Sequence, residues 1–242
     1  MKIYISIDDT DSLDIGATGQ SANALRKMIK DKGWGDSEPV TRHQLLLHPD
    51  IPYTSHNSSM CFSVDVGMNN LEELINCAAD FLENTSAPGS DPGLCVAVSD
   101  RIKDVDHLIS FGFRAKTEIL SKDEAYITAE HCGIHLSEHG GTGLGIIGAM
   151  AGVALRITGN DGRFQGKMQL KDSGEPMGIQ EIIENTAIDE VQSIEGQTLR
   201  NDEIIIIGDK IKTVLLDGKR KLLVYRKNDE WHTCTNKHLQ NY

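Results

Sequence analysis

Residues 2–11 read KIYISIDDTD, and this stretch decides how the fold begins. Its first six residues alternate β-branched or aromatic side chains with others, a pattern that predicts a strand. Four aspartates follow within seven residues: Asp8, Asp9, Asp11 and Asp14. The apolar stripe of residues 20–32 then predicts a helix. The opening unit is therefore a strand, an acidic loop and a helix, and the end of such a strand is where α/β proteins place ligands.

The aspartates have two interpretations. Carboxylates this close together repel one another unless a cation or solvent neutralises them. Their hard oxygens suit Mg²⁺, so we expect Asp8, Asp9 and Asp11 to bind this metal, with Asp9 and Asp11 also catalytic. The alternative is a solvated acidic turn, in which an Asp or Ser side chain caps the following helix.

Two glycine-containing loops precede predicted helices. Free amides at a helix N-terminus bind anions, and glycine lets a phosphate approach the backbone. The expected nucleotide contacts are Gly16, Thr18 and Gly19 in the first loop, and Gly140, Gly141, Thr142, Gly143 and Gly145 in the second. Thr18 also offers a hydroxyl as a nucleophile. The GxGxxG pattern at 143–148 follows a polar stretch rather than a strand, which disfavours a dinucleotide fold. Close helix packing is the alternative for the second loop.

The rest of the chain predicts a mixed α/β protein with a β-rich end. Residues 60–135 have the size of a small α+β domain, and residues 144–155 form an almost uncharged, buried helix. Four short strands are expected at 204–207, 211–216, 221–226 and 231–234. The Asp217-Gly218 turn between two of them is a strong hairpin signal. An antiparallel meander that closes as a small barrel is the natural architecture.

Composition limits the function classes. The net charge is −12, and an acidic body argues against broad contact with a nucleic-acid backbone. Residues 200–242 differ, with nine basic and six acidic residues. The five cysteines form no CxxC pair, which disfavours a disulfide framework and a Cys-rich zinc site. Apolar runs long enough for a membrane span and a signal peptide are both missing, so we expect a cytoplasmic protein without a membrane partner.

Polar side chains elsewhere suggest further sites. The loop at 52–59 contains Tyr53, His56 and Asn57, which can line a substrate pocket, although an ordinary turn has the same composition. His131, His135 and His139 would share one face of a continuous helix and bind a metal there. Glycines at 133 and 140 argue against that helix, so solvated histidines are the favoured interpretation.

Three motifs together resemble the archaeal agmatinylcytidine synthetase that modifies an isoleucine tRNA. The first is Ile7-Asp8-Asp9-Thr10-Asp11-Ser12 with its Gly/Thr turn. The second is Arg42 and a leucine-containing strand leading to Asp50-Ile51-Pro52-Tyr53 and Asn57. The third is Gly141-Thr142-Gly143-Leu144 with Ile147-Gly148-Ala149-Met150-Ala151. They occur in the family's order and span about residues 1–155.

The resemblance implies three domains. A kinase-like nucleotide-binding domain would comprise residues 1–59 plus 136–165, with a ferredoxin-like domain inserted at 60–135. Residues 166–242 would form an OB-like domain. The resemblance also implies ATP and Mg²⁺ at the aspartates. Together with Arg42 of the second motif, the loop residues Tyr53, His56 and Asn57 are the expected substrate contacts. The family places a phosphate-accepting or catalytic Thr in its Gly-x-Cys-Thr loop, but Thr18 matches the Cys.

Three functions stay open at this point. The first is an ATP- and Mg²⁺-dependent phosphoryl- or adenylyl-transfer enzyme, whose acceptor is an unknown small molecule or RNA. The acidic body and the lack of a Cys-rich zinc ribbon argue against tRNA. The second is a nucleotide-binding sensor or accessory protein without turnover. The third is a phosphatase with an aspartyl nucleophile, although Leu13 stands where that motif has Thr or Val.

Overall fold

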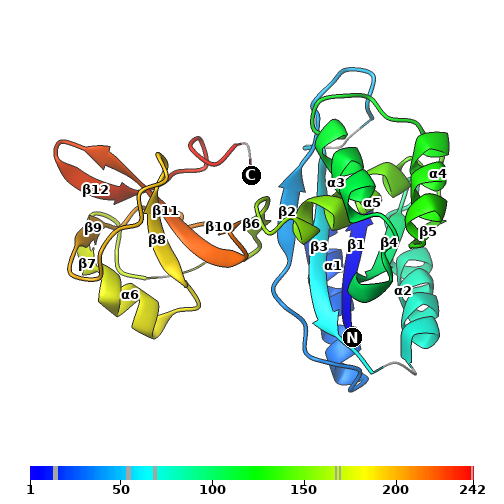
Figure 1. Ribbon diagram of the computed structural model, residues 1–242, viewed down its shortest axis with the longest axis horizontal. Coiled ribbons are helices and arrows are strands. Elements are labelled where there is room, and N and C mark those ends of the chain that lie inside the picture. Colours follow the sequence, from blue (N-terminus) through cyan, green and yellow to red (C-terminus); the bar gives the residue numbers. More distant parts are fainter. Residues whose placement is uncertain (13–15, 53–55, 68–69, 167, 169, 241) are drawn as a thin grey trace. The chain divides into compact units, whose positions relative to one another are not determined.

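The computed structural model describes residues 1–12, 16–52, 56–67, 70–166, 168, 170–240 and 242. The chain forms two compact units, Met1–Thr158 and Gly159–Tyr242 (Figure 1). Within the described ranges, no helix has the length and apolar character needed to cross a bilayer.

The first unit is built on an antiparallel sheet with β1 (Lys2–Asp8) at its centre. The strand order is β5-β4-β1-β3-β2. The other strands are β2 (Thr41–Gln44), β3 (Ser58–Asp65), β4 (Gly93–Val98) and β5 (His135–Glu138). Because β3 and β4 both pair with β1, segments far apart in the sequence meet along one central strand.

Helices cover both faces of this sheet (Figure 1). Among the described residues the helices are α1 (Thr18–Asp31), α2 (Leu71–Thr85), α3 (Val105–Arg114), α4 (Lys122–Cys132) and α5 (Gly145–Ile157), with a short 3₁₀ turn at Ser99–Arg101. The first two pack on one face, where they bury Ile3, Ile5 and Ile7 of β1. The opposite face carries α5, and α3 and α4 pack against it. Successive side chains of a strand point to opposite faces of the sheet, so β1 contributes to the packing of both helix layers.

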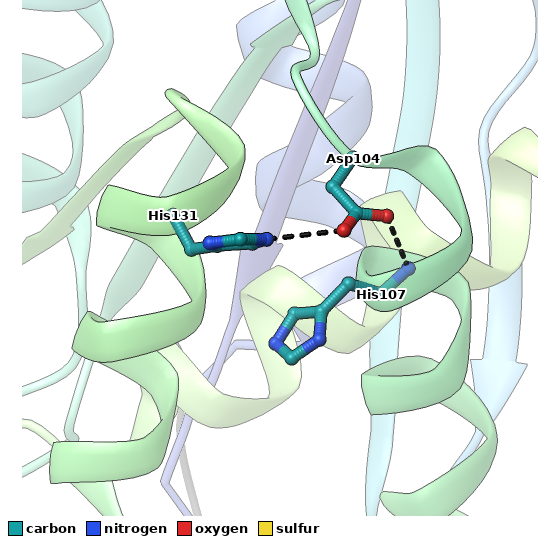
Figure 2. A group of neighbouring side chains, drawn as sticks. All are labelled: Asp104, His107 and His131. Atoms are coloured by element: carbon teal, nitrogen blue, oxygen red, sulfur yellow. Dashed lines mark hydrogen bonds and ion pairs between the residues drawn. The ribbon is translucent and has the colours of Figure 1, made fainter.

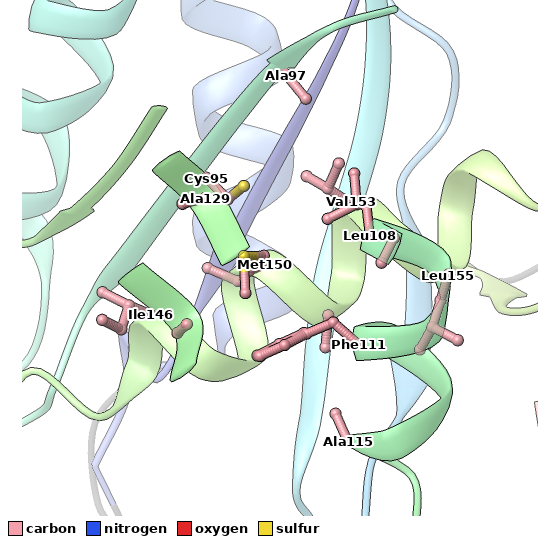
Figure 3. Close-up of a cluster of buried hydrophobic side chains, with 14 of the residues drawn as sticks. Cys95, Ala97, Leu108, Phe111, Ala115, Ala129, Ile146, Met150, Val153 and Leu155 are labelled. Carbon is pink, nitrogen blue, oxygen red and sulfur yellow. The ribbon is translucent and has the colours of Figure 1, made fainter. Parts of the chain in front are cut away.

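Helix α5 approaches the sheet unusually closely. A methyl group at Gly152 would overlap the hydroxyls of Ser6 and Ser59, and one at Gly148 would overlap the Asp8 carboxylate. The side of α5 that faces away from the sheet packs in a hydrophobic cluster, where Met150 and Leu155 lie with residues of α3 and α4 (Figure 3). The predicted uncharged helix is therefore buried on two sides, as its composition requires.

The second unit is a sheet with the order β6-β10-β11-β12-β9-β7. Its strands are β6 (Arg163–Phe164), β7 (Pro176–Gly178), β8 (Glu190–Ser193), β9 (Ile204–Ile206), β10 (Thr213–Leu216), β11 (Lys219–Lys227) and β12 (Glu230–Thr233), and helix α6 spans Ile179–Asn185. The β10–β11 hairpin turns at Asp217 and Gly218, both with positive φ, as the sequence predicts.

The antiparallel meander predicted for this unit needs correction. A meander requires β9 to pair in an antiparallel way with β10, its neighbour in sequence. Instead, β9 pairs in parallel with β12. The strand β8, which the sequence analysis missed, pairs in parallel with β11. The closure of this sheet into a small barrel stays a prediction.

The predicted domain boundaries differ from the two units. Residues 60–135 do not form a separate inserted domain, because β3 and β4 supply two strands of the same sheet as β1. The second unit begins at Gly159 rather than at residue 166. The coarser prediction, a mixed α and β fold with a β-rich C-terminal part, is confirmed.

Candidate functional site

Strand register brings the candidate residues to the end of the first sheet where β1 stops. We call this row of strand ends the site edge. Asp8, the last residue of β1, lies opposite Gly93, the first of β4, and Gly93 lies opposite Glu138, the last of β5. On the other side, Ile7 of β1 pairs with Met60, near the start of β3. In an antiparallel sheet the strand that ends at an edge has neighbours that begin there. The acidic loop and the loops before β4 and after β5 therefore share this edge.

The aspartates after β1 repel one another in a poorly solvated place. Burial, followed by the charges of Asp9 and Asp11, raises the pKa of Asp8 to about 8. Burial, followed by the charges of Asp91 and Asp11, raises the pKa of Asp9 to about 6. Asp9 also has a φ of +52°, in the left-handed region that few non-glycine residues adopt. Carboxyl groups that keep protons near neutral pH are common at functional sites, and such groups readily exchange the proton for a cation.

Thr18 joins the start of α1 to the aspartates. Its Oγ1 donates to Asp11 Oδ1 at 2.6 Å and accepts from the Thr10 amide at 3.4 Å. The turn before the helix uses Gly16 with a φ of +82°, and Ala17 provides no side-chain cap for the first amides. The first predicted loop and the acidic cluster therefore form one continuous site.

The second loop is held by Asp91, a residue that the sequence analysis missed. The Thr142 amide donates to Asp91 Oδ1, the Gly143 amide donates to the same oxygen at 3.3 Å, and Thr142 Oγ1 donates to Oδ2 at 2.7 Å. A carboxylate of the chain thus lies where the sequence predicts a phosphate. Since the charge of Asp91 also raises the pKa of Asp9, this residue links the two predicted loops.

A second set of contacts fixes the same loop from outside. Lys122 Nζ donates to Glu138 Oε2 and to the Thr142 carbonyl, both at 2.7 Å, and the Tyr126 hydroxyl donates to Glu138 Oε1 at 2.7 Å. Gly143 has a φ of +77°, and a Cβ there would overlap the Glu138 carboxylate. Local packing thus accounts for this glycine, and contact of the loop with a nucleotide stays a prediction.

Three predicted substrate residues fall within the described ranges: Arg42 lies in β2, and His56 and Asn57 come just before β3. The Arg42 guanidinium donates to Ser58 Oγ and to Gln44 Oε1, both at 2.9 Å. The Asn57 side chain donates to the Leu46 carbonyl at 2.7 Å. These bonds tie the two strands together near the site edge. His56 is exposed, whereas Tyr53 lies outside the described residues. Contact of any of them with a substrate stays a prediction.

The aspartates do not converge on a single point. In the part of the chain that the structure describes, one group of three His, Cys, Asp or Glu residues has ligand atoms all within 4.8 Å of one another, and it lies at Asp104, His107 and His131. Asp8, Asp9 and Asp11 therefore offer one or two carboxylates to a given ion. That number is usual for Mg²⁺, which takes its remaining oxygens from phosphates and water.

Comparison with known proteins supports a relationship to TiaS, an agmatidine synthetase that acts on an isoleucine tRNA. No family model and no curated protein matches the chain. It resembles the crystal structure of TiaS in complex with its tRNA and ATP, with 25% identity and a TM-score of 0.55, over 64% of this chain and 36% of that one. A tRNA fluorescent labelling enzyme gives 25% identity and a TM-score of 0.54, with the same coverage. A complex of TiaS with tRNA, AMPCPP and agmatine gives 24% and 0.52, over 63% and 36%. The chain thus matches little more than a third of each neighbour.

Proposed function

We propose that the chain is an ATP- and Mg²⁺-dependent enzyme that transfers a phosphoryl or adenylyl group. The observation that carries this proposal is the acidic site at the sheet edge, where Asp8, Asp9, Asp11 and Asp91 influence one another beside the start of α1. The fold likeness to a TiaS complex that contains ATP supports the same conclusion. Transfer chemistry of this kind depends mainly on positioning and on charge neutralisation.

The aspartates fit a hard divalent cation. Mutual repulsion and burial raise the pKa of both Asp8 and Asp9, and a bound cation would remove the cause of that repulsion. Asp9 is half-exposed and adopts a strained backbone conformation, so we assign it the direct metal contact. When bound, the metal ion would supply positive charge that neutralises the phosphate groups.

The phosphates would lie at the start of α1. This helix begins without a side-chain cap, so its first amides and the positive end of its dipole are suited to an anion. Neither glycine loop contains a lysine, and Lys122 beside the second loop is already paired with Glu138. The metal ion must therefore neutralise the charge of the phosphates, and nucleotide affinity should depend on Mg²⁺.

Asp11 and Thr18 are the proposed catalytic pair. The Thr18 hydroxyl donates to Asp11 at 2.6 Å, so this carboxylate orients the hydroxyl and is placed to accept its proton. Thr18 itself is buried, which limits its access to a large acceptor. We therefore assign Asp11 the role of base and Thr18 the role of its partner, which either accepts the transferred group or positions Asp11.

The acceptor is proposed to be RNA. The sequence-based expectation against tRNA is not supported, because a structural neighbour of the chain is a complex with an isoleucine tRNA. The net charge of −12 places any RNA contact on a local basic surface rather than on the whole protein. A small-molecule acceptor is the alternative, and product analysis separates the two.

Nucleotide binding is the first test. Isothermal titration with ATP, with and without Mg²⁺, should show binding that requires the metal. Asp9→Asn should weaken this binding about tenfold or more, equal to ~1.4 kcal/mol or more. The matched control Asp36→Asn changes an exposed carboxylate paired with Lys30 and should bind like the parent. Equal ATP affinity in all three proteins would contradict the proposed site.

Product analysis is the second test. The full chain is incubated with ATP, Mg²⁺ and total tRNA, and we expect either phosphate or pyrophosphate to be released. The released product identifies which bond of ATP is broken. Binding without turnover would point to a sensor. Phosphate attached covalently to Asp9 would point to a phosphatase-type mechanism.

A further inference from the structure

We infer that Asp104, His107 and His131 form a second metal site, for a divalent transition ion of the Zn²⁺ class. Each residue offers one ligand atom, and these atoms all lie within 4.8 Å of one another. Figure 2 shows the three side chains turned toward one another between the start of α3 and the end of α4. The residues belong to neither glycine loop nor the aspartate cluster, so this inference is independent of the proposed function.

Hydrogen bonds between the start of α3 and the end of α4 hold the three residues close together. Asp104 is the N-cap of α3, and its Oδ1 accepts the His107 amide at 2.9 Å. Its other oxygen, Oδ2, is 3.0 Å from His131 Nε2. His131 lies in the last turn of α4, which Gly133 ends in a left-handed conformation. The Lys103 amide donates to the Cys132 carbonyl at 3.0 Å and so holds the two helix ends together.

The distances suit a tetrahedral ion after a small adjustment. Metal–ligand bonds of about 2.0–2.1 Å place tetrahedral ligand atoms ~3.3 Å apart. The Asp104–His131 pair, at 3.0 Å, needs to open by only a few tenths of an ångström. The His107 and His131 ring centroids are 4.9 Å apart and the rings are tilted by 59°, so they are not stacked face to face. The ligand atom of His107 lies within 4.8 Å of the other two, so it needs to move closer by about 1.5 Å at most.

The donor set selects the class of metal. Two imidazoles and one carboxylate suit Zn²⁺, Co²⁺ or Ni²⁺, whereas Mg²⁺ and Ca²⁺ prefer oxygen ligands throughout. The side chains of Asp104 and His131 are 41% and 53% exposed, so an ion can enter from solvent. Three protein ligands leave a fourth position for water or another ligand. The Thr128 hydroxyl, 3.5 Å from His107 Nε2, supports the orientation of that ring.

Zinc titration of the full chain without nucleotide tests this site. Calorimetry with zinc chloride should show one ion bound here. His131→Gln keeps an amide that can donate to Asp104, and Asp104→Asn keeps the helix cap, so both variants should fold. Each should weaken this binding by about 100-fold, since even the partners behind metal ligands contribute 10–100-fold. The matched control His48→Gln changes an exposed histidine paired with Asp50 at 3.7 Å, and it should bind Zn²⁺ like the parent.

The aspartate cluster is a competing location, and one more variant separates the two. Zinc binding that survives His131→Gln but is lost in Asp9→Asn belongs to the aspartates and would overturn the inference. Failure of the parent to bind Zn²⁺ would overturn it as well. Cobalt(II) gives an independent readout, because visible absorption of the tetrahedral type should appear in the parent and in His48→Gln but not in His131→Gln.

Discussion

Replacing Asp8 by Asn should stabilise the metal-free protein near neutral pH. The Asp8 carboxyl is buried beside Gly148, and its pKa is raised to about 8 by burial and by the charges of Asp9 and Asp11. The folded protein must therefore either hold a proton on Asp8 or bury a charge there. Asparagine has the same shape, carries no charge and can still accept the Asp9 amide that Asp8 Oδ1 accepts at 2.9 Å.

The size of the effect follows from linkage between proton binding and folding. Unfolded Asp8 loses its proton near pH 3.8, whereas folded Asp8 holds it until about pH 8. Between these values the folded state binds more protons, so the free energy of unfolding decreases as the pH rises. The slope is at most ~1.4 kcal/mol per pH unit, which limits the decrease between pH 5 and pH 7 to ~3 kcal/mol. Relaxation around the charge lowers this value, so we expect about 1–3 kcal/mol.

Urea unfolding at pH 5 and pH 7 with a chelator measures this change. The parent should lose stability between the two pH values, and Asp8→Asn should lose much less, with a remainder from Asp9, whose pKa is about 6. Adding Mg²⁺ at pH 7 should restore more stability to the parent than to the variant, in which only the remainder from Asp9 can be restored. Asp36→Asn, an exposed control, should follow the parent. Parallel pH dependence of the parent and Asp8→Asn would refute the argument.

Three further predictions concern stability. Gly152→Ala places a methyl group against two buried serine hydroxyls and should cost about 1–3 kcal/mol in thermal or urea unfolding, whereas Gly67→Ala, which enters open space, should cost less than ~1 kcal/mol. Ser121→Ala removes a capping box from α4 and should cost about 1 kcal/mol in the same assay. Burial would raise the pKa of Glu38, but the hydrogen bonds and charges of Lys2 and Arg156 lower it to about 2. Its stabilisation is therefore lost as pH falls from ~4.5 to ~2, and Glu38→Gln should remove that pH dependence, of less than ~1 kcal/mol for this half-exposed group.

The sequence predicts local elements of the first unit well and their pairing poorly. The alternation of residues 2–7 correctly indicates a strand, and the apolar stripes of α1 and α2 indicate helices. Nothing local shows that β3 and β4 both pair with β1, because pairing depends on side-chain contacts between distant segments. The predicted inserted domain is wrong for this reason. The pairing of β9 with β12 was missed in the same way.

The sequence likewise predicts those residues of the candidate site that cluster locally, but not those that meet only in space. The aspartate density near residue 8 is a local signal that the sequence shows. Asp91 lies in an ordinary loop, and only its contacts with Thr142 and Gly143 mark it as part of the site. Glycine in a left-handed turn and glycine in a phosphate loop look alike in sequence, since both need a small residue. His131 likewise meets Asp104 and His107 in space, rather than the histidines four and eight positions later.

The packing of Asp8 against Gly148 disfavours a solvated turn at the acidic edge and is compatible with the proposed metal site. Glycine inside a helix costs about 1 kcal/mol relative to alanine, and an alanine at 148 would overlap the Asp8 carboxylate. A buried carboxylate among other carboxylates is a second cost at the same point. A solvated acidic turn needs neither feature, because exposed carboxylates are neutralised by water and salt. A cation held by Asp9 beside Asp8, as proposed, would offset the electrostatic cost, and Gly148 leaves the room that the Asp8 carboxylate needs.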